Sequence, residues 1–471
     1  MNKGMNAFVF LVALIAGFGG FLFGFDSSVI ADVKDQVISQ LSLTDWQWAQ
    51  VVSSSLLGCV LGIPISGLVA DRISRRSLLK IVAVGFMIGS SLCALAPGLS
   101  FLLLGRFAIG ICIGVASYIA PLFIAEIAPP NRRGSLVLIN GLTITFGQAS
   151  AYLIGYFLHD YSLMSWRYLF WIGSLPSLVL FLGMHFVPHS PRWLMVKHGA
   201  EVTLKTLKQI RPSGYDIQQE LVEIRNNLAK PGRNYSQIFK RPIVFVLLVG
   251  IGLGIFQQFS GINALMYYGP VIFESAGFFP VKNAILATFF LGLVNFIFTI
   301  VTLFSIDKLG RRFLLISGTL IASISLFLVS LLFYNPLLTN KFWIVGSLSF
   351  YVMGYCISLG SLFWVLISEI YPLSVRGLAM SIATVFQWSA NFVVSLSFLS
   401  IYQYTGQVFT FALFASFCLL ACWFVYYFVP ETTSISLEKL EENLNTGMKI
   451  RDIGQPVSKD TKITKFELIM D

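Results

Sequence analysis

The chain has 471 residues, of which 56% are apolar and only 11% are charged. Soluble domains average about 25% charged residues, so this composition is that of a protein that crosses a membrane many times rather than of a soluble domain. The formal charge of +10 indicates loop lysines and arginines that face an anionic lipid surface, and no nucleic acid is expected as a partner.

Twelve stretches of the sequence are long and apolar enough to cross a bilayer, which takes about 20 residues per helix. The first is too long for the apolar core of a signal peptide and is expected to be retained. The predicted spans lie at about 8–31, 47–70, 78–97, 101–124, 136–159, 166–187, 243–277 (long and broken), 282–306, 313–333, 342–368, 376–400 and 405–428.

The basic residues predict how the chain is oriented. Connections 2–3, 4–5 and 8–9 read DRISRRSLLK, PPNRRG and DKLGRR, and both the stretch 190–241 and the tail after Pro430 are also basic. The opposite connections hold few positive charges: Lys34, Arg167, Lys282 and Lys341. Positive residues collect on the cytoplasmic side. We therefore expect both termini to be cytoplasmic and the polar stretch 190–241 to form small helices at that surface.

The sequence repeats itself at matching places in two halves. EIAPPNRRG (126–134) returns as EIYPLSVRG (369–377), and DRISRR (71–76) returns as DKLGRR (307–312). Two parallel six-span halves imply a cavity between them near the membrane midplane. The predicted domains are an N-terminal six-helix bundle, a small helical domain, a C-terminal six-helix bundle and a cytoplasmic tail, at 1–188, 189–242, 243–429 and 430–471.

An acid and a base are predicted at the same depth in the membrane. Asp26 lies about 27 Å into the outward-running first span, and Arg106 about 8 Å into the inward-running fourth span. An ionised group in a span costs several kcal/mol unless it is paired or hydrated, and pairing Asp26 with Arg106 meets that need. Arginine stays charged, so only Asp26 can exchange a proton, as coupling to a proton gradient requires. A static structural pair, or an Asp26 simply hydrated at the outer interface, is the alternative.

The seventh span carries three amides, Gln257, Gln258 and Asn263, interrupted by glycines and Pro270. Buried amides need hydrogen-bond partners, and broken helices in membranes line cavities. Amides donate and accept without charge, so they suit neutral, hydroxyl-rich solutes, although helix–helix contacts would also explain them.

Other spans add weaker candidates for solute contact. A further amide lies in the fifth span, and two tryptophans, whose faces stack on the apolar side of a ring, lie with an asparagine in the tenth and eleventh. For each of these, packing within the bundle is the alternative reading. The residues are Gln148, Trp364, Trp388 and Asn391.

Charged clusters in matching loops of the two halves predict an ion-pair latch at the cytoplasmic face, with ordinary positive loop residues as the alternative. The latch residues are Asp71, Arg72, Arg75, Arg76, Glu126, Arg132, Arg133, Asp307, Arg311, Arg312, Glu369 and Arg376.

Nearly the whole chain resembles the sugar porter family of the major facilitator superfamily. The matching motifs are GGFLFGFD (19–26), DRISRR, GRFAIGICIG (105–114), PLFIAEIAPPNRRG (121–134), PHSPRWL (188–194), QQFSGIN (257–263), DKLGRR, WVLISEIYPLSVRG (364–377) and PETT (430–433). The resemblance implies an all-α fold with twelve transmembrane helices in two bundles, a small intracellular helical domain and alternating access. It implies that Asp26 and Arg106 form the pair of proton-coupled members, and it adds Phe23 and Asn295 as lesser solute-binding candidates.

The chain departs from the family pattern at the predicted latch and in the fifth span. His189, Ser74, Thr433 and Ser434 replace the usual residues of three cytoplasmic motifs. In the fifth span, xylose and glucose porters commonly place a solute-binding Gln where this chain has Gly141. The run INGLTITFGQ instead looks like proton-coupled myo-inositol porters, which favours a cyclitol over an aldose.

The sequence therefore predicts a proton-coupled symporter of myo-inositol or a monosaccharide such as xylose or glucose, in a bacterial inner membrane. A passive facilitator and a non-transporting nutrient sensor are the alternatives. The chain shows no nucleophile–base constellation, metal-ligand spacing or phosphate-binding loop, so no enzyme activity, metal or cofactor is expected. The partners are the solute, protons and lipid, and a monomer is expected.

Overall fold

The computed structural model describes residues 7–70, 72–129, 133–212, 215–229, 238–335, 340–372, 375–433, 437–446, 448 and 450–454. Every regular element within these ranges is a helix, as predicted. Eleven helical stretches in them are long and apolar enough to cross a membrane.

The first five predicted spans are single helices whose ends agree with the prediction to within a few residues, and the sixth is divided in two. A short helix that was not predicted, α2 (Lys34–Leu41), follows the first span. The spans are α1 (Ala7–Asp32), α3 (Asp45–Val69), α4 (Arg75–Ala94), α5 (Leu99–Ile127), α6 (Arg133–Leu158), α7 (Ser165–Ile172) and α8 (Ser174–Phe186).

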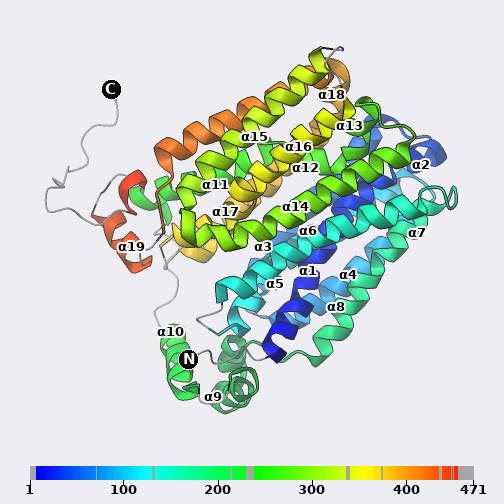
Figure 1. The fold of residues 1–471 in the computed structure, drawn as a ribbon. Helices are drawn as coiled ribbons and strands as arrows, with labels where there is room; N and C mark the ends of the chain where they lie inside the picture. Colours follow the sequence, from blue (N-terminus) through cyan, green and yellow to red (C-terminus); the bar gives the residue numbers. More distant parts are fainter. Residues whose placement is uncertain are drawn as a thin grey trace. The chain divides into compact units, whose positions relative to one another are not determined.

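The predicted polar stretch forms α9 (Pro191–Ile210) and α10 (Ile217–Ala229), which pack on each other at one end of α5 (Figure 1). After the last span, α19 (Leu437–Asn445) and a 3-10 turn (Ile450–Asp452) follow.

The seventh span is broken, as predicted. α11 (Arg241–Phe259) ends two residues before Gly261, whose φ of 90° favours glycine, and α12 (Ile262–Tyr267) and α13 (Gly269–Ser275) continue. The eighth and ninth spans are α14 (Val281–Leu309) and α15 (Arg311–Tyr334).

The tenth span changes helix type in its middle. It consists of α16 (Lys341–Tyr355), a π-helical turn (Cys356–Gly360) and α17 (Ser361–Glu369). The last two predicted spans form α18 (Arg376–Phe428), which bends at Gly406 with a φ of 79°. Because α18 holds two spans, the eleven stretches correspond to the twelve predicted crossings.

The chain divides into two compact units. The first comprises Met1–Gly232, Met266–Val271 and Phe279–Phe296, and the second Arg233–Leu265, Ile272–Phe278 and Ile297–Asp471. In the first unit α3 packs along α5, α1 along α6 and α4 against α5 and α8 (Figure 1).

Glycines bring α3 and α5 into close contact. A Cβ on Gly110 of α5 would overlap the backbone of Ser55 in α3, and one on Gly114 would lie 2.5 Å from the Cys59 carbonyl. Small residues four apart allow such backbone approach in membrane helices. This contact places Ser55 beside Arg106, one turn before Gly110.

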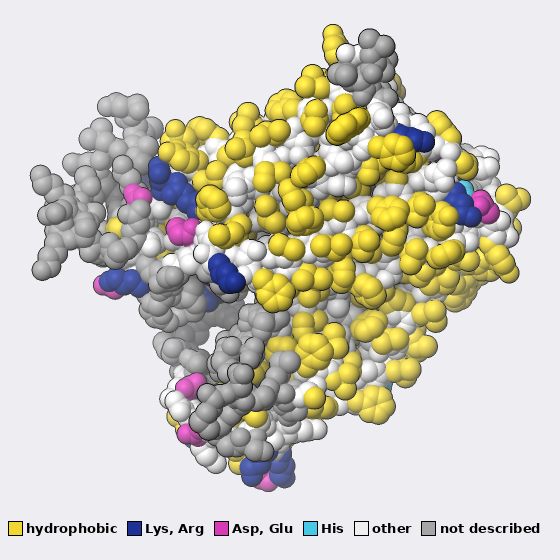
Figure 2. Space-filling model, viewed as in Figure 1, with side chains coloured by type: hydrophobic (Ala, Val, Ile, Leu, Met, Phe, Trp, Pro, Cys, Tyr) yellow, Lys and Arg dark blue, Asp and Glu magenta, His cyan; other side chains and the backbone are white. Residues whose placement is uncertain are grey.

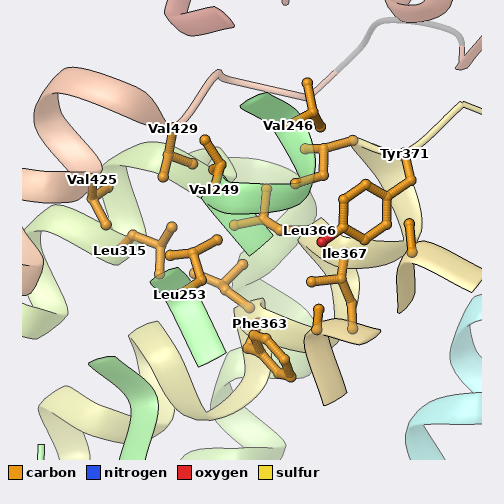
Figure 3. Close-up of a cluster of buried hydrophobic side chains, with 14 of the residues drawn as sticks. Val246, Val249, Leu253, Leu315, Phe363, Leu366, Ile367, Tyr371, Val425 and Val429 are labelled. Atoms are coloured by element: carbon orange, nitrogen blue, oxygen red, sulfur yellow. The ribbon is translucent and has the colours of Figure 1, made fainter. Parts of the chain in front are cut away.

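In the second unit, a hydrophobic cluster joins α11, α15, α17 and α18 (Figure 3). Val249 and Leu253 of α11 lie against side chains of α17, among them Phe363 and Leu366. This packing fixes α17 next to α11, and so determines where the polar groups at the ends of these helices lie.

On the face shown in Figure 2, apolar side chains cover the helix flanks, while lysine and arginine lie mainly near the helix ends. Phe157, Phe304 and Leu331 are each at least 60% exposed. Side chains of this kind on a surface suit contact with lipid rather than water.

Replacing Gly110 by Val is expected to force α3 and α5 apart, because the new side chain would overlap the Ser55 backbone. Overpacking of this kind costs about 1–3 kcal/mol. The thermal midpoint of the purified protein in detergent should fall. Gly67→Val on α3 is the matched control, since a Cβ there meets no atom within 4 Å. Equal midpoints for the two variants would contradict the close-packing account.

Candidate functional site

The predicted acid–base pair is present in the first unit. The Arg106 guanidinium donates through Nη1 to Oδ1 of Asp26 and through Nη2 to the Ser55 hydroxyl at 2.7 Å. Asp26 and Arg106 are 5% and 2% exposed. Ser55 was not predicted, because one serine in an apolar span gives no signal that it faces a charge.

Because Asp26 and Arg106 are buried, a change in the charge of either residue has a large effect on stability. Removing one member of a buried ion pair leaves the other uncompensated and is strongly destabilising. Arg106 cannot lose its proton in a protein. A change in charge at this point must therefore come from the carboxyl of Asp26.

Two predicted amides, on α6 and α14, are connected to α1 through Ser27, the residue after Asp26. Asn295 of α14 donates to Gln148 Oε1 at 3.0 Å, and Gln148 donates to the Ser27 hydroxyl at 3.4 Å. Both amides are buried, and Phe23 lies half-buried on the same helix, one turn before Ser27. A chain of hydrogen bonds thus ends next to Asp26.

The three amides of the seventh span form a second network, in the second unit. Asn263 donates to Gln258 at 2.6 Å, and Gln257 donates to the Leu359 carbonyl at 2.9 Å. Gln387 of α18, which was not predicted, donates to Gln257 Oε1 at 3.1 Å. The sequence could have indicated Gln387, because it is an amide within an apolar span and directly precedes Trp388.

The remaining predicted aromatic and amide residues differ in exposure. Trp388 and Asn391 on α18 are buried, and Asn391 accepts a hydrogen bond from Ser395 at 3.1 Å. Trp364 on α17 is 39% exposed and packs edge-on against Phe363. Trp364 therefore presents an accessible ring, whereas Trp388 is enclosed.

Among the described residues of the first unit, the predicted latch residues include an ion pair and several helix-end contacts. Arg75 Nη2 lies 3.2 Å from Glu126 Oε1. Arg76 instead donates to the carbonyls of Met184 and His185, at 2.7 and 2.8 Å, at the end of α8. Asp71 and Arg132 lie outside the described residues, as do the side chains of Arg133 and Asp307.

The second unit repeats this pattern. Arg311 lies 3.4 Å from Glu369, and Arg312 donates to the Tyr426 carbonyl near the end of α18. Arg376 donates to the Tyr371 carbonyl at 3.2 Å. The pairs Arg75–Glu126 and Arg311–Glu369 thus occupy corresponding positions of the two sequence repeats.

Two further contacts at these helix ends were missed. Arg211, after α9, forms a bidentate pair with Glu220 at 2.6 and 2.7 Å and donates to the Ile127 carbonyl at 2.6 Å. Nothing in the sequence distinguishes Arg211 from its basic neighbours. Glu431 lies in the PETT motif (430–433). Its position directly after the last span could have indicated a contact at a helix end.

Glu431 caps the start of α15. Its carboxylate accepts hydrogen bonds from the backbone N–H groups of Arg311 and Arg312, both at 3.0 Å, and from the Thr433 hydroxyl at 2.6 Å. Burial alone would raise the pKa of Glu431, but these hydrogen bonds outweigh it and lower the pKa below its usual 4.5. A negative charge at a helix N-terminus is favourable.

Comparison with known proteins relates this architecture to transporters. The model of the family described as "Sugar (and other) transporter" matches residues 12–444. The galactose-proton symporter of Escherichia coli K12 is 32% identical over 462 residues, covering 96% of this chain and 98% of that protein. The arabinose-proton symporter of Bacillus subtilis is 35% identical, covering 92% and 95%.

A solved structure of similar fold is the major facilitator superfamily proton:xylose symporter XylE bound to 6-bromo-6-deoxy-D-glucose. It superposes with a TM-score of 0.79 at 32% identity, covering 93% of this chain and 99% of that one. The similarity therefore extends over both halves of the chain.

Glu431→Gln is expected to destabilise the protein at neutral pH by about 1 kcal/mol, the usual effect of losing a helix cap. Because the folded-state pKa is depressed, the stabilisation is present above the usual value of 4.5 and is lost as pH falls through the folded pKa. Thermal midpoints of wild type and variant should thus differ at pH 7 and converge below pH 4.5. A difference that is constant with pH would contradict the charged cap.

Proposed function

This chain belongs to the sugar (and other) transporter family, and we propose that it is a symporter that moves a proton together with a neutral polyhydroxylated solute by alternating access. Membership of a transporter family places it in the membrane as a multi-pass protein of the major facilitator fold, as predicted. The solute, the coupling and the roles of individual residues are the content of the proposal.

The observation that carries the proposal is the buried contact of Asp26 with Arg106. With Asp26 ionised, its attraction to Arg106 holds α1 against α5. A proton on Asp26 removes that attraction and leaves Arg106 bonded to Ser55. Protonation thus changes the energy of one conformation relative to another, which is what coupling requires.

The solute would be held by amides rather than by charged groups. The Gln148–Asn295 network begins at Ser27, the residue after Asp26, so a solute hydroxyl that displaces one of these hydrogen bonds acts close to the proton site. Gln257, Gln258 and Asn263 offer donors and acceptors of the same kind. Neutral hydroxyl groups match amides without the cost of burying a charge.

We assign the latch to the ion pairs Arg75–Glu126 and Arg311–Glu369, and place both termini in the cytoplasm. Both pairs are partly buried, so each is stronger than an exposed pair but is still breakable.

A proton that crosses 100 mV contributes about 2.3 kcal/mol, enough for a solute gradient of about 50-fold.

Asp26→Asn is expected to abolish accumulation, because an amide cannot exchange a proton with either side. In proteoliposomes with an imposed proton gradient, wild type should concentrate labelled solute, whereas the variant should only equilibrate it. Retained solute exchange by the variant shows that it is folded. The exposed Asp35→Asn on α2 is the control and should accumulate like wild type.

Each alternative gives a different result in that assay. A facilitator would equilibrate solute even as wild type, and a sensor would move none. Accumulation by Asp26→Asn equal to that of wild type would refute the proposed role of Asp26.

The choice of solute depends on the fifth span. The named relatives carry galactose and arabinose, which supports an aldose, whereas Gly141 favours a cyclitol such as myo-inositol. A Cβ on Gly141 would meet no atom within 4 Å, so this position leaves room for a bulkier solute. We propose myo-inositol as the preferred solute, tested by competition among myo-inositol, xylose, glucose and galactose.

Gly141→Gln should shift preference from myo-inositol toward xylose and glucose, because it adds a donor and an acceptor and fills space. One added hydrogen bond is worth about 1 kcal/mol, or roughly a fivefold change in relative apparent affinity. Gly141→Ala is the control, since it fills little space and adds no amide. An unchanged order of competition in Gly141→Gln would remove this position from the determinants of specificity.

A further inference from the structure

The first span contains a second buried acid that the sequence analysis did not single out. Asp32 is the last residue of α1, is 6% exposed, and neither of its carboxyl oxygens has a hydrogen-bond partner among the described residues. It lies about 9 Å along the helix from Asp26 and is rotated by about 240° around the axis. The two acids therefore face different neighbours.

Asp32 lies directly on the backbone of α6. A Cβ added to Gly155 would overlap the Asp32 carboxyl, so this contact exists only because residue 155 is glycine. Ser28, one turn earlier on α1, is also buried, and its hydroxyl faces Tyr152 of α6. Three buried polar atoms of α1 thus lie within one turn.

The surrounding groups do not stabilise a charge on Asp32. Tyr152 of α6 lies close enough to Asp32 to interact with it electrostatically, but the Tyr152 hydroxyl donates to the Met266 carbonyl at 2.6 Å. Among the described residues, neither Lys34 nor Lys282 forms an ion pair with Asp32. Lys282 instead pairs with Asp160 at 2.7 Å.

A carboxylate inside a membrane protein with neither a cation nor a hydrogen-bond donor costs several kcal/mol, and such a group binds a proton instead. Asp26 differs because Arg106 compensates its charge. We propose that Asp32 is a second proton site of the transport cycle, neutral in the conformation described and ionised when α6 separates from the segments that Tyr152 contacts. This inference rests on the proposed proton-coupled transport.

Tyr152 connects the surroundings of Asp32 to α12 and α14. Its hydroxyl holds Met266 at the end of α12, and its ring lies 3.2 Å from the position of a Cβ on Gly292 in α14. Met266 and Gly292 follow the first sequence repeat but belong to the same compact unit as α1 and α6, whereas the start of α12 and the end of α14 belong to the second unit.

When these segments leave α6, water reaches Asp32. The carboxyl O–H bond then breaks and its proton passes to water. The reverse transfer must precede closure, because an ionised Asp32 would be buried without a partner.

Infrared spectroscopy tests the protonation directly and needs neither transport nor a known solute. In the reconstituted protein at neutral pH, wild type should show the carbonyl stretch of a protonated, buried carboxyl that shifts on exchange into heavy water. Asp32→Asn should lack this band. Asp26→Asn and the exposed Asp35→Asn should keep it, and in Gly155→Ala it should move, because the new methyl displaces the carboxyl. The same band in wild type and Asp32→Asn would overturn the proposal.

Solute exchange tests the role in the cycle. In the Asp26→Asn background, exchange should fall as the medium becomes alkaline, and adding Asp32→Asn should remove that fall. An identical pH profile for the single and double variants would overturn the proposed role in the cycle. If Asp26→Asn still accumulates solute, the proposed function fails, yet the infrared result for Asp32 can still be read separately.

Discussion

The first unit is organised around the buried positive charge of Arg106. Arg106 cannot be neutralised, so the first unit must supply a fixed negative charge and a hydrogen-bond acceptor to it, which are Asp26 and Ser55. That requirement ties three helices together. The glycines of α3 and α5 bring Ser55 close enough, and the amides that extend from Ser27 share the same dry environment.

Outside the hydrocarbon region, polar groups serve mainly to satisfy helix ends. Arg76 and Arg312 donate to the last carbonyls of α8 and α18, and Glu431 accepts from the first N–H groups of α15. The contacts of Arg76 and Arg312 occur at corresponding places in the two sequence repeats. The charged motifs therefore hold the ends of each helix bundle, and the ion pairs of Arg75 and Arg311 add contacts that can break.

Apolar length alone predicted the twelve crossings, because the bilayer imposes it on each span. The Asp26–Arg106 pair was predictable for a similar reason, since two opposite charges at one depth must meet. Ser55 was missed because which side chains face each other depends on helix rotation, which a continuous apolar pattern does not encode. Gln387 and Asp32 were missed although each is a polar residue in an apolar span, which was a usable signal. Two spans, 376–400 and 405–428, were predicted where α18 bends at Gly406, but the π-helical turn in the tenth span was not predicted.

The π-helical turn at Cys356–Gly360 holds one residue more per turn than a regular helix. This extra residue determines the direction of the side chains that follow it in the helix, including those of Trp364 and Glu369. Within the turn, the Leu359 carbonyl accepts a hydrogen bond from Gln257. Losing a single residue there would rotate all later side chains by about 100°. A change in the length of this turn would therefore redirect Trp364 and Glu369 without any exchange of these residues themselves.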